Sequence, residues 1–121
     1  MLANAEYLAA DPYAGADAEN GKRLAVLCLA CHSVEPGGSH MIGPNLYGFF
    51  GSKAGRRDGY DYSPALDSAE FVWTPRALDA WMAQPADFLP GNRMTFAGVN
   101  RSSDRADIIA YLLDVTDKNQ E

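Results

Sequence analysis

The chain has 121 residues, the size of one ordinary domain, and it is 47% hydrophobic, so it can bury a core. Sixteen acidic and ten basic residues give a formal net charge of −6 at pH 7. This argues against nucleic acid as a partner, because nucleic-acid-binding proteins carry a basic patch or stripe. No stretch approaches the roughly 18 apolar residues that a membrane-spanning helix needs.

Residues 1–16 lack the basic start and the apolar run of a secretory signal peptide. We therefore expect them to be an N-terminal extension or linker remnant, followed by one domain at residues 17–121. Two interpretations stay open. The segment is the remainder of a linker from a removed membrane anchor, or its side chains Tyr7, Leu8 and Tyr13 pack onto the domain.

The first helix of the domain is predicted to begin after Asp17, whose side chain can cap it, and to run through Gly21 to Cys28. A long glycine-rich loop follows. Ser63-Pro64 and Thr74-Pro75 each combine a capping side chain with a proline suited to the first helical position, which predicts two further helices. The second of these runs to about residue 84, where Pro85 stops it.

The last helix is predicted to be capped by Ser102 or Ser103 and to reach about Thr116. Its apolar residues fall at i, i+3, i+4 and i+7 and form one stripe: Ile108, Tyr111, Leu112 and Val115. The chain is therefore predicted to be all-α, with about four helices separated by long loops. Loops of this length are unusual in a compact domain unless they wrap around something.

Two thiols stand three residues apart in the sequence Cys28-Leu29-Ala30-Cys31-His32. The pattern C-x-x-C-H is typical of c-type haem attachment. Near a helix end the two thiols face the same way and can add to the two vinyl groups along one haem edge. The following histidine is then carried to one axial position of the iron.

Two other kinds of site share this pair of thiols. A thioredoxin-like redox pair needs a βαβ setting, and the sequence shows no strand-like alternation of useful length. A structural zinc site usually has four Cys or His ligands. The chain offers two cysteines and two histidines, with His40 only eight residues after His32.

A sixth iron ligand would have to come from His40 or from a methionine. His40 and Met41 are close to His32 in sequence, whereas Met82 lies on a predicted helix and is better explained as a core residue. Met94 follows a Pro90-Gly91 turn, 62 residues after His32, which gives the chain room to pass around a haem. The sequence therefore favours Met94 over Met82.

Further motifs extend over about residues 17–116. They are Gly43-Pro44-Asn45-Leu46, Trp73, Pro90-Gly91-x-x-Met94-x-Phe96-Ala97-Gly98 and Arg105-Ala106-Asp107-Ile108-Ile109-Ala110-Tyr111-Leu112. Together with Cys28-x-x-Cys31-His32, and in this order, they resemble class I cytochromes c, most closely the mitochondrial and bacterial c2 branch. The resemblance implies the cytochrome c fold wrapped around one covalent haem c.

The resemblance also implies roles for individual residues. His32 and Met94 would be the axial iron ligands, a pair that raises the reduction potential and leaves no open site for a substrate. The Pro44 carbonyl would accept a hydrogen bond from the other nitrogen of His32. Tyr62 and Trp73 would bond a haem propionate, and His40 would bond loop backbone. Where the first and last helices cross, the resemblance places Gly21 and Tyr111.

Some positions depart from the family pattern. Ser52 stands where the family usually has an arginine near a propionate, and Arg56 or Arg57 is a candidate substitute. Three residues of a buried polar network are replaced, namely Leu66, Trp81 and Asn92. Positions that often carry lysines around the haem edge read Leu27, Met41, Ala86, Arg93, Asn100 and Arg101. Two of these six are basic, so we expect partner docking through apolar contact with weak dependence on salt.

The function implied is that of a monohaem electron carrier and not an enzyme, shuttling single electrons between redox complexes of a respiratory or photosynthetic chain. Partners would be a bc1-type donor and a terminal oxidase or photosynthetic acceptor. We expect a monomer in the periplasm or an equivalent compartment, free or tethered. The alternative is a haem sensor or peroxidase-like domain that binds ligand after loss of Met94. A third hypothesis is a module that receives electrons and passes them to a separate enzyme chain.

Overall fold

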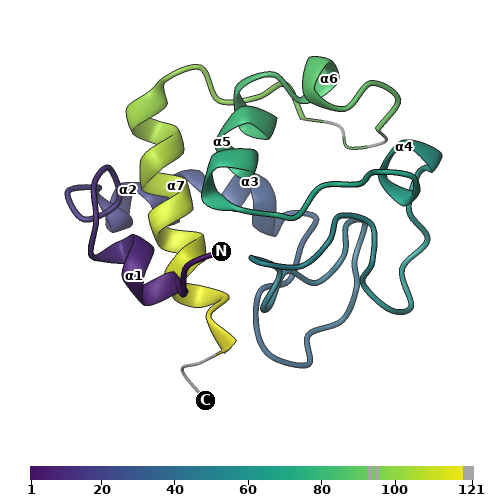
Figure 1. The fold of residues 1–121 in the computed structure, drawn as a ribbon, viewed down its shortest axis with the longest axis horizontal. Coiled ribbons are helices and arrows are strands. Elements are labelled where there is room, and N and C mark those ends of the chain that lie inside the picture. Colours follow the sequence, from purple (N-terminus) through teal and green to yellow (C-terminus); the bar gives the residue numbers. More distant parts are fainter. Residues whose placement is uncertain (93, 95, 119–121) are drawn as a thin grey trace.

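The computed structural model describes residues 1–92, 94 and 96–118, and regular structure in these residues is helical (Figure 1). The helices are α1 (Asn4–Leu8), α2 (Ala18–Leu24), α3 (Val26–Leu29), α4 (Pro64–Asp67), α5 (Pro75–Ala83), α6 (Pro85–Phe88) and α7 (Ser102–Val115). Within the described residues no strand forms, and Lys53 and Val72 make an isolated antiparallel bridge. The all-α prediction is confirmed, although short helices raise the number above the four expected.

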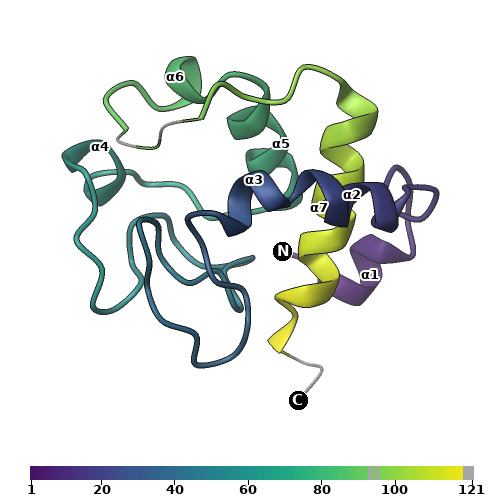
Figure 2. The ribbon, with the colours of Figure 1, turned by 180° about the vertical axis from the view of Figure 1, so that it is seen from behind.

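Among the helices of the described residues, α2 and α7 make the most extensive contact, and Figure 2 shows the two helices crossing near the middle of α7. Asp17 caps α2 by accepting from the Asn20 backbone N–H at 3.1 Å, as predicted. A Cβ atom on Gly21 would overlap the backbone carbonyl of Asp107. Only glycine lets the two backbones approach this closely.

The predicted serine–proline and threonine–proline helix starts are confirmed. Ser63 accepts from the Leu66 backbone N–H at 3.4 Å to cap α4, and Thr74 accepts from Ala77 at 3.1 Å to cap α5. The helix α5 ends at residue 83, and Pro85 then begins the single turn α6. Each proline occupies a first helical position, where its missing N–H costs nothing.

The start of α7 differs from the prediction. The helix begins at Ser102 itself, Arg101 is the N-cap residue, and no side chain caps it. Arg105 fixes this turn instead, because its guanidinium donates to the carbonyls of Val99 (2.8 Å) and Asn100 (2.9 Å). The buried face of α7 is also wider than the predicted stripe, with these residues buried: Ile108, Ile109, Ala110, Leu112 and Leu113.

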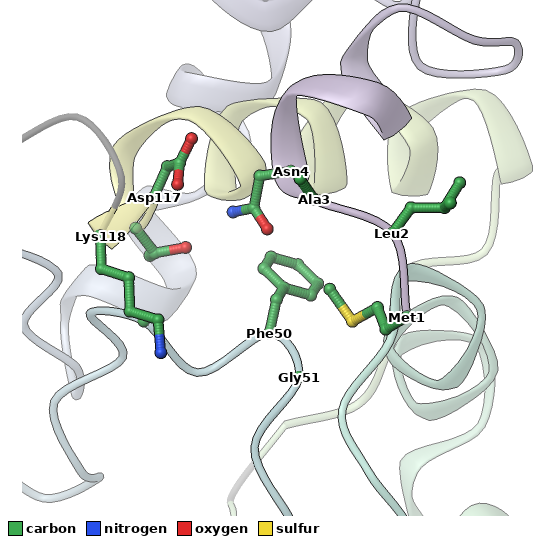
Figure 3. Close-up of a pocket in the computed structure, with 10 residues that line it drawn as sticks. Met1, Leu2, Ala3, Asn4, Phe50, Gly51, Asp117 and Lys118 are labelled. Carbon is green, nitrogen blue, oxygen red and sulfur yellow. The ribbon is translucent and has the colours of Figure 1, made fainter.

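The N-terminal segment packs against the rest of the protein. The helix α1 lies on α7, and Asn4 donates to the Leu113 carbonyl at 2.9 Å in a buried hydrogen bond. Figure 3 shows Asn4 and Met1 beside the ring of Phe50, at a pocket of about 330 Å³ between this segment, the turn after residue 48 and the end of α7. Tyr7, Leu8 and Tyr13 pack onto the core.

The long segment between α3 and α4 forms the other side of the molecule, facing the helices (Figures 1 and 2). The main apolar core lies on the helical side, where α5 and α7 supply Trp81, Met82, Ile108 and Leu112. Because the Cys28–His32 motif begins at the end of α3 and precedes the long segment, it lies where the helical side meets the loop side.

None of the helices in the described residues has the length and apolar character needed to cross a bilayer.

We expect Gly21→Ala to destabilise the protein by about 2–4 kcal/mol, because the added methyl group overlaps backbone that cannot rotate away. Denaturant unfolding of the haem-loaded protein measures the loss. The matched control is Gly15→Ala, where the new Cβ would lie 3.8 Å from the Asp11 side chain, an ordinary contact. Equal losses in the two variants would contradict the close crossing.

Candidate functional site

The two cysteines lie at the end of α3, and both are free and half-buried. The Cys31 and His32 backbone N–H groups donate to the Cys28 carbonyl at 3.0 and 2.8 Å, so the helical turn continues through the motif. Burial, followed by the charge of Cys31, raises the pKa of Cys28 to about 11. A redox dithiol needs a thiolate near neutral pH, so this environment does not favour thioredoxin-like exchange.

The His32 ring is held in one orientation by the chain that follows it. Its Nδ1 donates to the Pro44 carbonyl at 2.7 Å, which is the contact that the resemblance implies. A Cβ atom on the buried Gly43 would overlap the ring, so the turn lies directly against the imidazole. Burial lowers the pKa of His32, with the Pro44 hydrogen bond opposing the shift less strongly. The ring is thus neutral near pH 7 and keeps its Nε2 lone pair.

A buried asparagine, Asn45, organises the loop around this histidine. Its amide nitrogen donates to Ser33 Oγ (2.9 Å) and to the Glu35 carbonyl (3.0 Å), and its oxygen accepts from the Tyr47 N–H (3.2 Å). Its backbone N–H donates to His40 Nδ1 at 3.0 Å. These contacts fix the residue next to Pro44, so they fix the carbonyl that orients the histidine.

His40 links two loops through both of its ring nitrogens. While its Nδ1 accepts from Asn45, its Nε2 donates to the Asp58 carbonyl at 2.7 Å. Both ring nitrogens are therefore occupied by backbone. The prediction that His40 bonds loop backbone is confirmed.

The structure separates the two candidate arginines. Arg56 is exposed and donates to the carbonyls of Gly55 (3.1 Å) and Asp67 (2.8 Å). Arg57 is half-buried, and its guanidinium donates to Asn45 Oδ1 at 2.9 Å. The Arg57 backbone N–H also donates to the Tyr62 hydroxyl at 3.1 Å.

Tyr62 is therefore held beside a cation. Burial raises its pKa, and the Arg57 N–H and charge oppose the shift less strongly, so its hydroxyl is protonated at neutral pH. With its oxygen already accepting, the hydroxyl proton can be donated to a further acceptor. At Ser52, where the family has its arginine, the hydroxyl donates to the Gly48 carbonyl at 3.3 Å.

Trp73 and Met94 lie at the edge of the apolar core. The Trp73 ring packs edge-on against Phe71 and Trp81, with ring centroids 4.8 and 5.9 Å away. Met94 is half-buried against the same core, whereas Met82 is only 2% exposed inside it. Met82 is thus a core residue, as predicted.

Two groupings follow from this geometry. The structure brings His32 and Pro44 into contact, and it places Tyr62 in contact with Arg57 and through it with Asn45. Trp73 and Met94 pack against the apolar core, and neither joins these two groupings through a hydrogen bond or ring contact among the described residues. Sequence reasoning does not single out Asn45, although an asparagine after proline in a turn is a recognised signal for side chain to backbone bonding.

These residues fit a covalent haem. Two free thiols one helical turn apart precede a histidine whose second nitrogen is already committed, and a glycine gives the ring its space. In the described ranges, no three His, Cys, Asp or Glu side chains gather as a metal site, so the zinc alternative finds no support. The fold and the site define the class of c-type haem proteins.

Comparison with known proteins leads to the same class. The family model for cytochrome c matches residues 18–116. Cytochrome c of Theileria parva is 40% identical over 86% of this chain and 90% of that protein, and cytochrome c of Kluyveromyces lactis is 37% identical over 84% and 94%. A cytochrome c homolog of Bradyrhizobium diazoefficiens is 44% identical over 80% of this chain but 53% of its own length.

The chain belongs to the cytochrome c family. The family carries one covalently bound haem c with iron, and its members are electron carriers that act with redox complexes. Haem c is therefore the group around which the long loops were predicted to wrap.

Proposed function

We propose that this protein carries single electrons between redox complexes, in the periplasm or an equivalent compartment, with His32 and Met94 as its axial iron ligands. The observation that carries the proposal is the His32–Pro44 hydrogen bond beside the two thiols. With Nδ1 engaged, the ring can offer only Nε2 to a metal. A bc1-type complex is the proposed donor, and a terminal oxidase or photosynthetic complex the proposed acceptor.

Met94 is the proposed second ligand because its thioether belongs to a half-buried loop residue, while Met82 is committed to core packing. The haem iron supplies the one-electron couple, and a His/Met pair raises its potential. The neighbouring residues hold His32 and Met94 in place, and the surrounding apolar core excludes water. Such a site needs no open coordination position, which supports a carrier over a catalyst.

The Met94 assignment is tested by the optical spectrum of the purified haem-loaded protein. In wild type we expect sharp low-spin bands when reduced and a weak sulfur-to-iron band when oxidised. Met94→Ala should abolish that weak band and lower the reduction potential, because the thioether ligand is lost. Met82→Leu, which keeps volume and apolar character, should retain it.

A wild-type spectrum that is high-spin, or that lacks the sulfur band, would contradict the carrier proposal. It would favour the sensor or peroxidase-like alternative, which requires an accessible sixth position.

Arg57 is proposed as the cation for a haem propionate. It is half-buried and fixed by Asn45, and its backbone holds the Tyr62 hydroxyl. A carboxylate near this pair would gain a charged partner and a hydroxyl donor. Arg56 is less suited because two carbonyls on the outer side already hold its guanidinium.

Arg57→Gln is expected to lower the reduction potential by some tens of millivolts. A nearby positive charge favours the reduced iron, and a half-buried charge acts through a lower effective dielectric than an exposed one. Redox titration measures the shift, with Arg56→Gln as the matched control. Equal shifts in the two variants would exclude a special role for Arg57.

The proposed docking face is apolar. Leu27 is 59% exposed and Ile42 is 79% exposed. The first lies in α3 directly before the thiols, and the second precedes Gly43, whose N–H donates to the Cys31 carbonyl at 2.7 Å. Val26 and Met41 beside them are exposed as well. The other predicted positions are also exposed, namely Ala86, Asn100 and Arg101, and Arg93 lies outside the described residues. A redox partner with an apolar contact face fits this surface.

Electron transfer from a purified bc1-type complex, measured over a series of salt concentrations, tests this docking mode. The wild-type rate should change by less than about tenfold, whereas electrostatic steering alters association by about ten- to thousandfold. Replacing Leu27 and Ile42 together by serine should slow transfer at every salt concentration. Val72→Ser, at another exposed apolar position, is the control. A steep fall of the wild-type rate with salt would argue against apolar docking.

A further inference from the structure

In the part of the chain that the structure describes, the side chain of Asn92 ties the loop that carries Met94 to the turn before it. The amide nitrogen of Asn92 donates to the carbonyls of Pro85 (3.2 Å) and Leu89 (3.0 Å). Its amide oxygen accepts from the Met94 backbone N–H at 2.9 Å. One planar group thus connects both ends of the α6 turn to the backbone of the proposed ligand.

This arrangement matters because it joins the turn to the Met94 backbone through one side chain. Prolines at positions 85 and 90 have no N–H to donate. The Pro85 carbonyl accepts from the Leu89 N–H at 3.2 Å, and the Leu89 carbonyl accepts from the Asn92 N–H at 3.2 Å. The Asn92 amide nitrogen adds a second donor to each of these carbonyls, and its oxygen holds the Met94 N–H. Asn92 is half-buried, so water competes less for these bonds than at an exposed position.

The other end of the loop is held independently. The Val99 N–H donates to the Met82 carbonyl at 2.7 Å, and Arg105 donates to the Val99 and Asn100 carbonyls while it pairs with Asp79 at 2.8 Å. Loss of the Asn92 bonds would therefore release the Met94 backbone without freeing the loop where it joins α7.

We propose that Asn92 is a positioning residue for Met94, which holds the thioether at the iron against competing ligands. The inference rests on the proposed His32/Met94 ligation and names the side chain that maintains it. A ligand tethered in this way dissociates rarely, so an external base gains little access to the sixth position. Without the tether, Met94 would be displaced more often.

Binding of imidazole to the oxidised haem-loaded protein measures that displacement. Asn92→Ala should raise imidazole affinity by at least about tenfold, because the hydrogen bonds that favour the closed loop are lost. It should also weaken the ferric sulfur-to-iron band. If the alanine variant does not accumulate with haem, Asn92→Ser serves, since a hydroxyl makes the same short-range bond more weakly and should shift affinity in the same direction.

Two controls separate positioning from general loosening. Asn100→Ala removes an exposed asparagine from the same loop and should leave imidazole affinity unchanged. Arg105→Gln removes the clamp at the other end, so it should lower the unfolding midpoint without a comparable rise in affinity.

The outcomes distinguish this inference from the proposed function. If wild type shows the sulfur band and Asn92→Ala binds imidazole no more tightly, the positioning role is wrong and the ligation stands. An effect of Arg105→Gln as large as that of Asn92→Ala would likewise overturn it, because any loosening would then suffice. If wild type lacks the sulfur band, Met94 is not the ligand and both ideas are wrong.

Discussion

The close crossing of α2 and α7 is the constraint on which the rest of the structure depends. Gly21 lies against the backbone of Asp107, and the Asp17 N–H donates to the Asp107 carboxylate at 2.8 Å, so the crossing is fixed both by space and by hydrogen bonding. Because α2 leads directly into α3, this crossing also determines where the thiols and His32 emerge. The helix α7 also packs against α1 and α5, so the C-terminal helix holds the N-terminal one.

On the loop side, polar side chains supply the hydrogen bonds that neighbouring strands supply to each other in other folds. Backbone groups of a long loop must find partners. Here Asn45 and His40 supply several of them, and they join residues 33–35, 44–47 and 58. The same side chains fix the residues next to Pro44, whose carbonyl orients the His32 ring. Loop stability and the orientation of His32 therefore depend on the same hydrogen-bond network.

Features that depend on residues within one turn of each other could be predicted from the sequence, whereas features that depend on contacts between distant residues could not. The caps at Asp17, Ser63 and Thr74 were correct because each depends on residues within one turn. The start of α7 was misplaced because Arg105, inside the helix, fixes the preceding turn. The short helix α1 has no strong pattern, and it owes its position to contacts with α7. The C-x-x-C-H motif correctly indicated the class of site. The hydrogen bond between Arg57 and Asn45 could not be predicted, because it joins residues 12 apart and depends on the folded path of the loop.

The departures from the family pattern have a common physical logic. A buried polar group can be bonded by a side chain from any position of the chain that reaches it. The other polar atoms of that side chain must then have partners of their own. Ser52 is turned to the Gly48 carbonyl, and the Arg57 guanidinium, five residues further along, is held by Asn45. At position 92, the side-chain amide bonds the Pro85 and Leu89 carbonyls as well as the Met94 N–H. Substitutions of this kind leave the Cys28–His32 motif unchanged while they move the charges and dipoles around the site. Because a haem potential responds to nearby charges and hydrogen bonds, proteins that share the motif can differ in reduction potential.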